Sequence, residues 1–210
     1  MSQSTFCTAL AASALLVGAC ATAPRSQSGH SSHQTRVRGL RMGGYTRMAV
    51  SGAYIETDVK YEEHQVGGGF GVSAAAGYYV LPGLALDLDA AFGMGFDARE
   101  QRYPRQLHGH SMAVLVGGGA TFYLLPDDWM ASLAIGVANI WGDVVTDETF
   151  YAYDDVHLGL GFGVHALLGK EWRAGPSGLG VALDVLFASG GSTYEDLTFV
   201  SIGAAFVWSR

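Results

Sequence analysis

Four of the seven histidines have the side-chain chemistry and the positions for a metal site. These four lie at the boundaries between charged and apolar segments; they are His64, His108, His110 and His157. Imidazole is a common ligand of divalent transition metals, so these side chains could meet at one rim of the molecule. The segments that carry them are not neighbours, however, and histidines at such places usually face water. We therefore predict no metal ion and no other cofactor, and keep the rim cluster as the alternative.

No motif combines the residue types that catalysis needs. The sequence contains neither the GxSxG turn of serine hydrolases nor the HExxH of zinc proteases. The glycine runs at residues 67–69 and 117–119 lie inside segments predicted as strands, so they are not phosphate-binding loops. His110 and Ser111 are adjacent, and in a strand their side chains would point to opposite faces. We predict a protein that is not an enzyme and has no catalytic residue.

Seven ionisable residues lie on the less apolar side of segments whose hydrophobicity alternates. They are Arg41, Arg47, Asp87, Asp89, Asp97, His165 and Asp184. Their neighbours on that side are mostly glycine and alanine, so in a closed sheet these charges would face inwards. Because buried charges need partners, we expect an internal ion-pair network, with a gated ion or proton path as the alternative. His165 and Asp184, expected roughly opposite each other on adjacent strands, are the most specific predicted pair.

A two-residue period positions these side chains. Between residues 84 and 96, large apolar residues at most even numbers alternate with Ala, Asp and Gly at odd numbers, which predicts a strand with two unlike faces. Eight segments show such alternation, and each has at least the ~9–11 residues that a tilted strand needs to cross a bilayer. They span about residues 38–54, 65–80, 84–98, 110–125, 129–142, 156–170, 178–188 and 197–209. The fourth, fifth and eighth alternate less regularly, which predicts bulges or an ambiguous register there.

The connections between these segments also alternate in character. Three are short turns rich in Pro, Gly or Asp, and the other four are mostly longer, polar and charged. Aromatic residues gather beside the short turns and, in a second group, towards the longer loops. The group beside the turns comprises Tyr78, Tyr79, Phe122, Tyr123, Trp129, Trp172, Phe206 and Trp208. Short turns at one end, longer loops at the other and two aromatic belts are typical of outer-membrane barrels.

The closing segment carries the most specific pattern. Ser201, Gly203, Phe206 and Trp208 give a polar residue, a glycine two positions on, and aromatics five and seven positions on. This resembles the C-terminal signal by which the bacterial assembly machinery recognises outer-membrane barrels, although the chain continues two residues further. Over about residues 38–209 the chain resembles the small eight-stranded barrels of the OmpA, OmpX and OmpW kind. The resemblance implies an all-β fold: an eight-stranded antiparallel up-and-down transmembrane β-barrel over residues 37–210.

The beginning of the chain predicts a targeting segment. Residues 7–19 are small and apolar but too few for a spanning helix, which predicts a signal peptide over residues 1–19. The Val-Gly-Ala before Cys20 resembles the lipobox of bacterial lipoproteins, in which this thiol receives a diacylglyceryl group. Cleavage by an ordinary signal peptidase, for instance after Ala21, is the alternative. Residues 20–36 are polar, and we expect them to form a flexible tether.

Composition agrees with this class and excludes others. Charged residues make up 15% of the 210 residues, against roughly 25% in an ordinary soluble domain. The net charge of −7 argues against nucleic-acid binding, which needs a basic surface. With two cysteines, one of them inside the signal peptide, no intramolecular disulfide is expected. A soluble lipocalin-like barrel would need the inverse pattern, with large apolar residues inside and polar residues facing water.

The sequence therefore predicts a non-enzymatic, monomeric protein of a Gram-negative outer membrane, with both termini in the periplasm. Its expected partners are outer-membrane lipid, lipopolysaccharide and the barrel-assembly machinery. An eight-stranded barrel is just wide enough to be filled by its own side chains, so no wide pore is expected. Structural support, surface presentation and low-conductance passage of small solutes all remain open. The alternative is an enzyme that modifies lipid or peptide at the extracellular rim.

Overall fold

The computed structural model describes residues 43–59, 63–100, 108–124, 128–145, 157–174, 177–191 and 196–210. All of them belong to one compact unit of the chain. The predicted signal peptide, Cys20, the tether and Arg41 lie outside the described residues. No described residue belongs to a helix long and apolar enough to cross a membrane.

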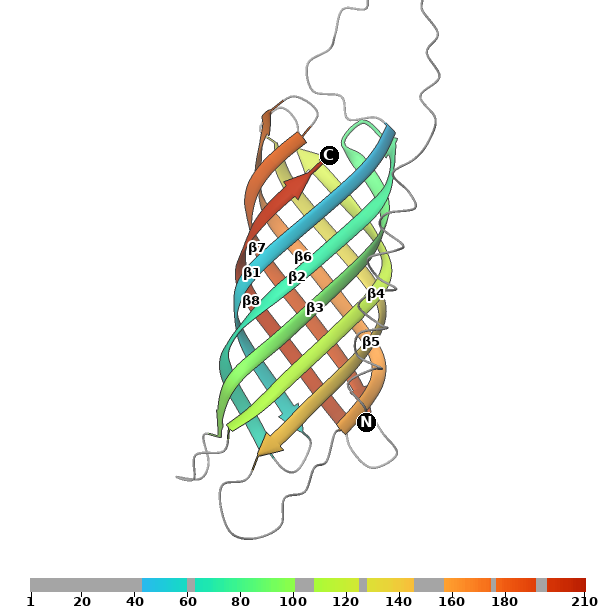
Figure 1. The fold of residues 1–210 in the computed structure, drawn as a ribbon. Coiled ribbons are helices and arrows are strands. Elements are labelled where there is room, and N and C mark those ends of the chain that lie inside the picture. The colour runs from blue at the N-terminus through green and yellow to red at the C-terminus, as the bar shows by residue number, and fades with distance from the viewer. Residues whose placement is uncertain are drawn as a thin grey trace, which may run out of the picture. The chain divides into compact units, whose positions relative to one another are not determined.

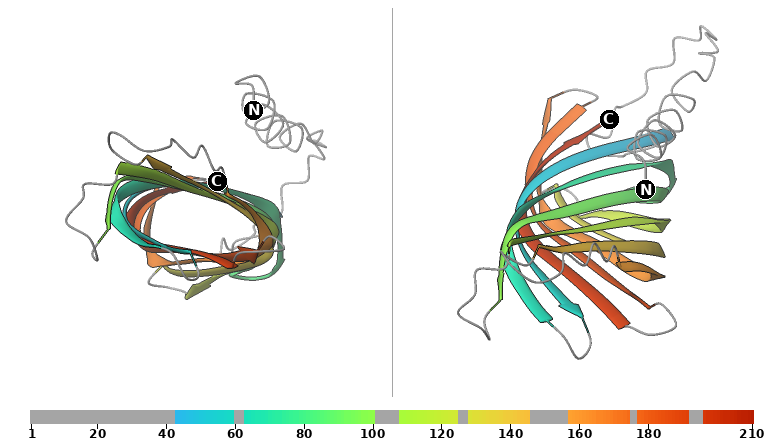
Figure 2. Two further views of the ribbon diagram at one scale, coloured as in Figure 1. Left: turned by 90° about the horizontal axis from the view of Figure 1, so that it is seen from below. Right: turned by 60° about the horizontal axis from the view of Figure 1, so that its bottom comes forward.

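Eight strands form the described unit. They are β1 (Gly43–Val59), β2 (Glu63–Leu81), β3 (Leu84–Glu100), β4 (His108–Leu124), β5 (Trp129–Val145), β6 (His157–Ala174), β7 (Ser177–Gly191) and β8 (Asp196–Ser209). Each strand pairs antiparallel with the next, and β8 pairs antiparallel with β1, so that the sheet closes on itself (Figures 1 and 2). The predicted eight-stranded antiparallel barrel is confirmed.

The strands extend further than the hydrophobic pattern predicts. β1 continues to Val59 instead of ending at residue 54, and β7 continues to Gly191 instead of 188. Polar side chains mark where the apolar environment ends, but the backbone hydrogen bonds of the ladder can continue in water. The bulge prediction was wrong for β5 and β8, whose ladders show no register shift. Register shifts lie in β3, between Gly95 and Arg99, where they affect the ladders with both β2 and β4, and at the end of β2, between Tyr79 and Leu81.

The outer face of the barrel is apolar. Leu86, Leu160 and Val181 are 52%, 66% and 52% exposed, so the large apolar side chains point away from the interior, as the alternation predicts. Soluble monomers rarely present contiguous apolar patches of more than a few hundred Å² to water. An apolar surface that continues around all eight strands instead matches the hydrocarbon core of a bilayer.

The aromatic belt beside the short turns differs from the prediction at two positions. Tyr78, Phe122 and Trp129 are exposed on the outer face, but Tyr79 and Tyr123 face the interior. Successive side chains of a strand point to opposite faces, so both members of the Tyr78-Tyr79 pair cannot contact lipid. The inward tyrosines pack against Tyr45, whose ring centroid lies 5.4 Å from that of Tyr79 and 6.4 Å from that of Tyr123.

Inward glycines let neighbouring strands approach closely where the small barrel bends. A Cβ atom at Gly117 would overlap the carbonyl oxygen of Ile135 on β5, and one at Gly136 would overlap that of Val116 on β4. These two glycines pair with each other in the β4–β5 ladder. Side chains at both positions would push the two strands apart. This explains why the glycine run at residues 117–119 lies inside a strand.

Gly117→Ala is expected to lower the free energy of unfolding by about 1–3 kcal/mol, because the added methyl group has no room beside the Ile135 carbonyl. The adjacent Gly118 provides a matched control, since a Cβ there meets nothing within 4 Å. Gly118→Ala should leave stability unchanged or raise it by up to about 1 kcal/mol. Urea unfolding of both variants in detergent measures the difference, and equal effects would contradict the close approach.

Candidate functional site

The interior of the barrel contains a polar layer between two apolar layers. The turn-side layer, near the short turns, consists of Tyr45, Ala49, Ala75, Ala85, Tyr123, Met130, Leu167, Ala182, Ala205 and Val207, with Tyr79 packed against it. The loop-side layer consists of Ile55, Ala91, Ala113, Leu115, Ala138, Ile140, Leu186, Ala188 and Phe199, with Ala53 packed against it. On β3 the order from the turn is Ala85, Asp87, Asp89 and Ala91, so the two carboxylates lie between the layers.

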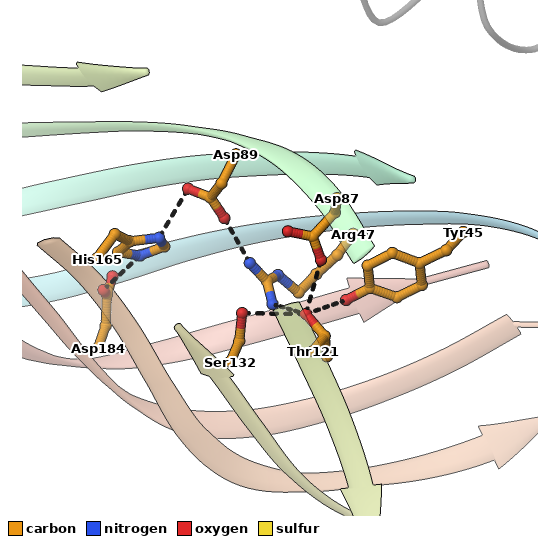
Figure 3. A network of polar contacts seen from close by, with 8 residues as sticks. All are labelled: Tyr45, Arg47, Asp87, Asp89, Thr121, Ser132, His165 and Asp184. Atoms are coloured by element: carbon orange, nitrogen blue, oxygen red, sulfur yellow. Dashed lines mark hydrogen bonds and ion pairs between the residues drawn. The ribbon is translucent and has the colours of Figure 1, made fainter. Parts of the chain in front are cut away.

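A chain of alternating charges crosses the polar layer (Figure 3). The Arg47 guanidinium donates from Nη2 to Asp89 Oδ2 at 2.6 Å. The other oxygen of Asp89 lies 2.8 Å from His165 Nδ1, and His165 Nε2 lies 3.1 Å from Asp184 Oδ1. The four side chains come from β1, β3, β6 and β7, so the chain of contacts connects opposite walls of the barrel. All four residues are buried, which makes their mutual pairing necessary.

His165 is the centre of this chain. Each of its ring nitrogens faces a carboxylate oxygen, and only the imidazolium form can donate a hydrogen bond from both nitrogens at once. The ladder pairs His165 with Leu186 and Asp184 with Leu167, so His165 and Asp184 contact each other diagonally and not directly across the strands. The contact between His165 and Asp89 crosses the interior, so the pairing of neighbouring strands could not predict it.

Thr121 is the hub of the remaining polar contacts. Its Oγ1 accepts a hydrogen bond from Arg47 Nη1 at 3.0 Å, donates to Asp87 Oδ2 at 2.9 Å and lies 3.0 Å from Ser132 Oγ. The Tyr45 hydroxyl donates to the same oxygen at 3.4 Å. This residue is uncharged, so the search for inward charges missed it. Its position on the inward side of β4 was the available signal.

Thr121→Val is expected to lower the free energy of unfolding by about 1–3 kcal/mol, because it leaves hydrogen-bonding groups of Arg47 and Asp87 buried without their partner. Thr57→Val is the control: this threonine is also buried, but its hydroxyl has no hydrogen-bond partner in the described part of the chain. The control should be neutral or slightly stabilising. Chemical unfolding followed by tryptophan fluorescence compares the two, and similar losses would remove the hub role of Thr121.

A second buried carboxylate lies in the turn-side half of the barrel. Glu171 on β6 accepts hydrogen bonds from the hydroxyls of Tyr123, at 3.2 Å, and Ser209, at 2.7 Å. Gly178 on β7 lies directly beneath this carboxylate, where a Cβ atom would overlap Glu171 Oε1. Sequence reasoning missed Glu171, although it follows His165, Leu167 and Gly169 on the inward side of β6. Its contact with Ser209 ties β6 to the closing strand.

The other predicted site residues have different outcomes. Ser201 is buried and Phe206 is exposed on β8, and Gly203 pairs with Asp184 in the β7–β8 ladder. The side chain of Asp97 lies outside the described residues, as do those of His64, His108 and His157. His110 is exposed and lies beside Phe96, with 6.1 Å between ring centroids. Among the described side chains, no group of three or more His, Cys, Asp or Glu residues is arranged to hold a metal ion.

The described polar layer is suited to holding the strands of the barrel together. Arg47, Asp89, His165 and Asp184 pair with one another, Asp87 is hydrogen-bonded to Thr121, and apolar side chains lie on both sides of these buried residues. The arrangement joins six of the eight strands through β1, β3, β4, β5, β6 and β7 (Figure 3).

No protein-family model matches the sequence, and no curated protein matches it either. Similar solved structures include Ail, the attachment invasion locus protein of Yersinia pestis, in complex with the heparin analogue sucrose octasulfate. The two sequences are 11% identical, the match covers 79% of this chain and 99% of that chain, and the TM-score is 0.47. They also include Neisserial surface protein A, with 13% identity, 79% and 96% coverage and a TM-score of 0.46. The outer membrane protein AlkL matches with 12% identity, 88% and 96% coverage and a TM-score of 0.31.

Proposed function

We propose that this chain is an integral outer-membrane barrel that is closed to solutes and serves as a rigid, non-enzymatic support for its surface loops. The observation that carries this proposal is the filled interior. Phe199, Leu115 and Tyr123 are each no more than 1% exposed, and they belong to the apolar layers on the two sides of the polar layer. An ion that approached His165 or Asp89 from either end would first have to pass apolar side chains of one of these layers.

The outer surface supports the membrane location. Trp129 and Trp172 lie on the outer face near the short turns, while Phe96 and Tyr54 lie towards the other end of their strands, with aliphatic side chains between the two levels. Aromatic girdles on both sides of an apolar band are typical of transmembrane barrels. Such barrels have short periplasmic turns, which supports a periplasmic position for the β2–β3 turn and for the end of β8.

Planar-bilayer recording tests whether the barrel is closed. The full chain, refolded in detergent and checked by heat-modifiable gel migration, is expected to insert without producing current steps in concentrated KCl. A porin reconstituted in the same way is the positive control. Reproducible steps whose size increases with salt concentration would overturn the closed barrel and favour the low-conductance alternative. A chain that shows no heat-modifiable migration would overturn the membrane location itself.

A further inference from the structure

A group of buried oxygen atoms in the polar layer is not satisfied by the ion-pair chain. The hydroxyls of Ser51 on β1 and Ser73 on β2 are buried and have no hydrogen-bond partner among the described residues. Asp184 uses Oδ1 to contact His165, whereas Oδ2 points towards β1 and β2. Buried polar atoms in folded proteins are usually satisfied by a protein group, water or an ion, so these oxygens indicate a ligand.

Two glycines bring Asp184 Oδ2 close to Ser51 Oγ. Asp184 pairs with Gly203 on β8, and Gly203 has no side chain to block the carboxylate from reaching β1. On the opposite wall, the Cβ position of Gly71 lies 2.5 Å from Ser51 Oγ and 3.5 Å from Asp184 Oδ2. Ser73 lies two positions further along the same face of β2. Asp184 faces the interior and is 8% exposed.

The charges of the polar layer point to a cation as that ligand. Three carboxylates, those of Asp87, Asp89 and Asp184, face one guanidinium and one imidazole. With all three carboxyl groups ionised and His165 as the imidazolium, the layer has one negative charge in excess. A net charge enclosed between apolar layers is costly, so a compensating positive charge is favoured.

We propose that Asp184 Oδ2 and the hydroxyl oxygens of Ser51 and Ser73 bind a monovalent metal cation, Na⁺, inside the barrel. Carboxylate and hydroxyl oxygens are hard ligands, which suit alkali and alkaline-earth cations better than transition metals. With one carboxylate oxygen and two neutral oxygens, the site offers less negative charge than a divalent ion requires. The apolar layers on both sides mean that the ion enters during folding and stays enclosed.

The test compares the urea unfolding of the full chain, refolded in detergent, in NaCl and in choline chloride at equal ionic strength. Choline is too large for a site between three side chains. Once Na⁺ saturates the folded state, each tenfold rise in its concentration should lower the unfolding equilibrium constant by up to about tenfold. Sodium that stays with the folded protein through desalting and is released when urea unfolds it, measured by atomic emission, gives a second readout.

Ser51→Ala removes one proposed ligand without touching the ion-pair chain, and should remove most of the Na⁺ dependence. Ser189→Ala, on the outer face of β7, is the matched control and should retain it. Asp184→Asn should abolish the dependence if the variant folds. Equal unfolding in both salts, an Na⁺ effect that Ser51→Ala leaves intact, or stability that depends on pH but not on Na⁺ would each overturn the site. The bilayer recordings are independent of these results, because a closed barrel needs no bound cation.

Discussion

Asp89→Asn is expected to destabilise the barrel by about 3–5 kcal/mol. Asp89 is the carboxylate that both Arg47 and His165 share, at 2.6 and 2.8 Å. Asparagine has nearly the same shape but no charge, so the substitution leaves a buried guanidinium without its counter-ion and removes one of the two carboxylates beside His165. The free energy of unfolding, measured by urea titration of the refolded protein in detergent, should show the loss.

The ion pair between Arg173 and Asp128 provides the control for this prediction. Its Nε to Oδ1 distance is 3.6 Å and both side chains are partly exposed, so Asp128→Asn should cost no more than about 1 kcal/mol. Combining Arg47→Met with Asp89→Asn should cost less than the sum of the two single changes, because neither partner is then left charged alone. A loss below about 1 kcal/mol for Asp89→Asn would show that the network does not hold the barrel together.

Ile135→Arg is expected to destabilise the lipid-embedded barrel by about 2–4 kcal/mol. Ile135 is 59% exposed on the outer face of β5, midway between Trp129 and Trp141. A guanidinium there would have to leave water for the hydrocarbon core. The measurement is urea unfolding in phospholipid vesicles, since the hydrocarbon core of a bilayer imposes the cost that the prediction describes.

Leu124→Arg serves as the depth control, because Leu124 has a similar exposure of 56% but ends β4 at the short-turn level. Near the interface the cost of arginine falls to about 0–1 kcal/mol. A difference between the two variants would therefore measure membrane depth and not a general intolerance of charge. If Ile135→Arg were as harmless as Leu124→Arg, the apolar band would not be facing lipid.

The alternation of side chains was enough to predict the outer face and much of the inner one. Leu86 and Val181 point outwards, and Arg47, Asp87 and His165 point inwards, because the two-residue period of a strand depends on the local sequence alone. The error at Tyr79 came from grouping it with Tyr78 by composition, when the same period already assigned the two to opposite faces.

Contacts across the interior could not be predicted in this way. Asp89 and His165 meet because β3 and β6 face each other at a particular stagger, and the stagger of a closed barrel is a property of all eight strands together. The same holds for Glu171 and Ser209, which meet through the position of β8 against β6 and β7. The ends of β1 and β7 also could not be predicted, because polar residues that lie beyond the apolar pattern still pair in the ladder.

The bridging position of Asp89 also bears on how the barrel is assembled. Arg47 and Asp89 are 42 positions apart in the chain, and Asp89 and His165 are 76 apart. A partly built sheet that held only the first few strands would have Arg47 and Asp89 available but neither His165 nor Asp184. Such an intermediate would leave the charged side chains of Arg47 and Asp89 without the enclosing strands, so we expect partial sheets to be short-lived and insertion to proceed as one cooperative event.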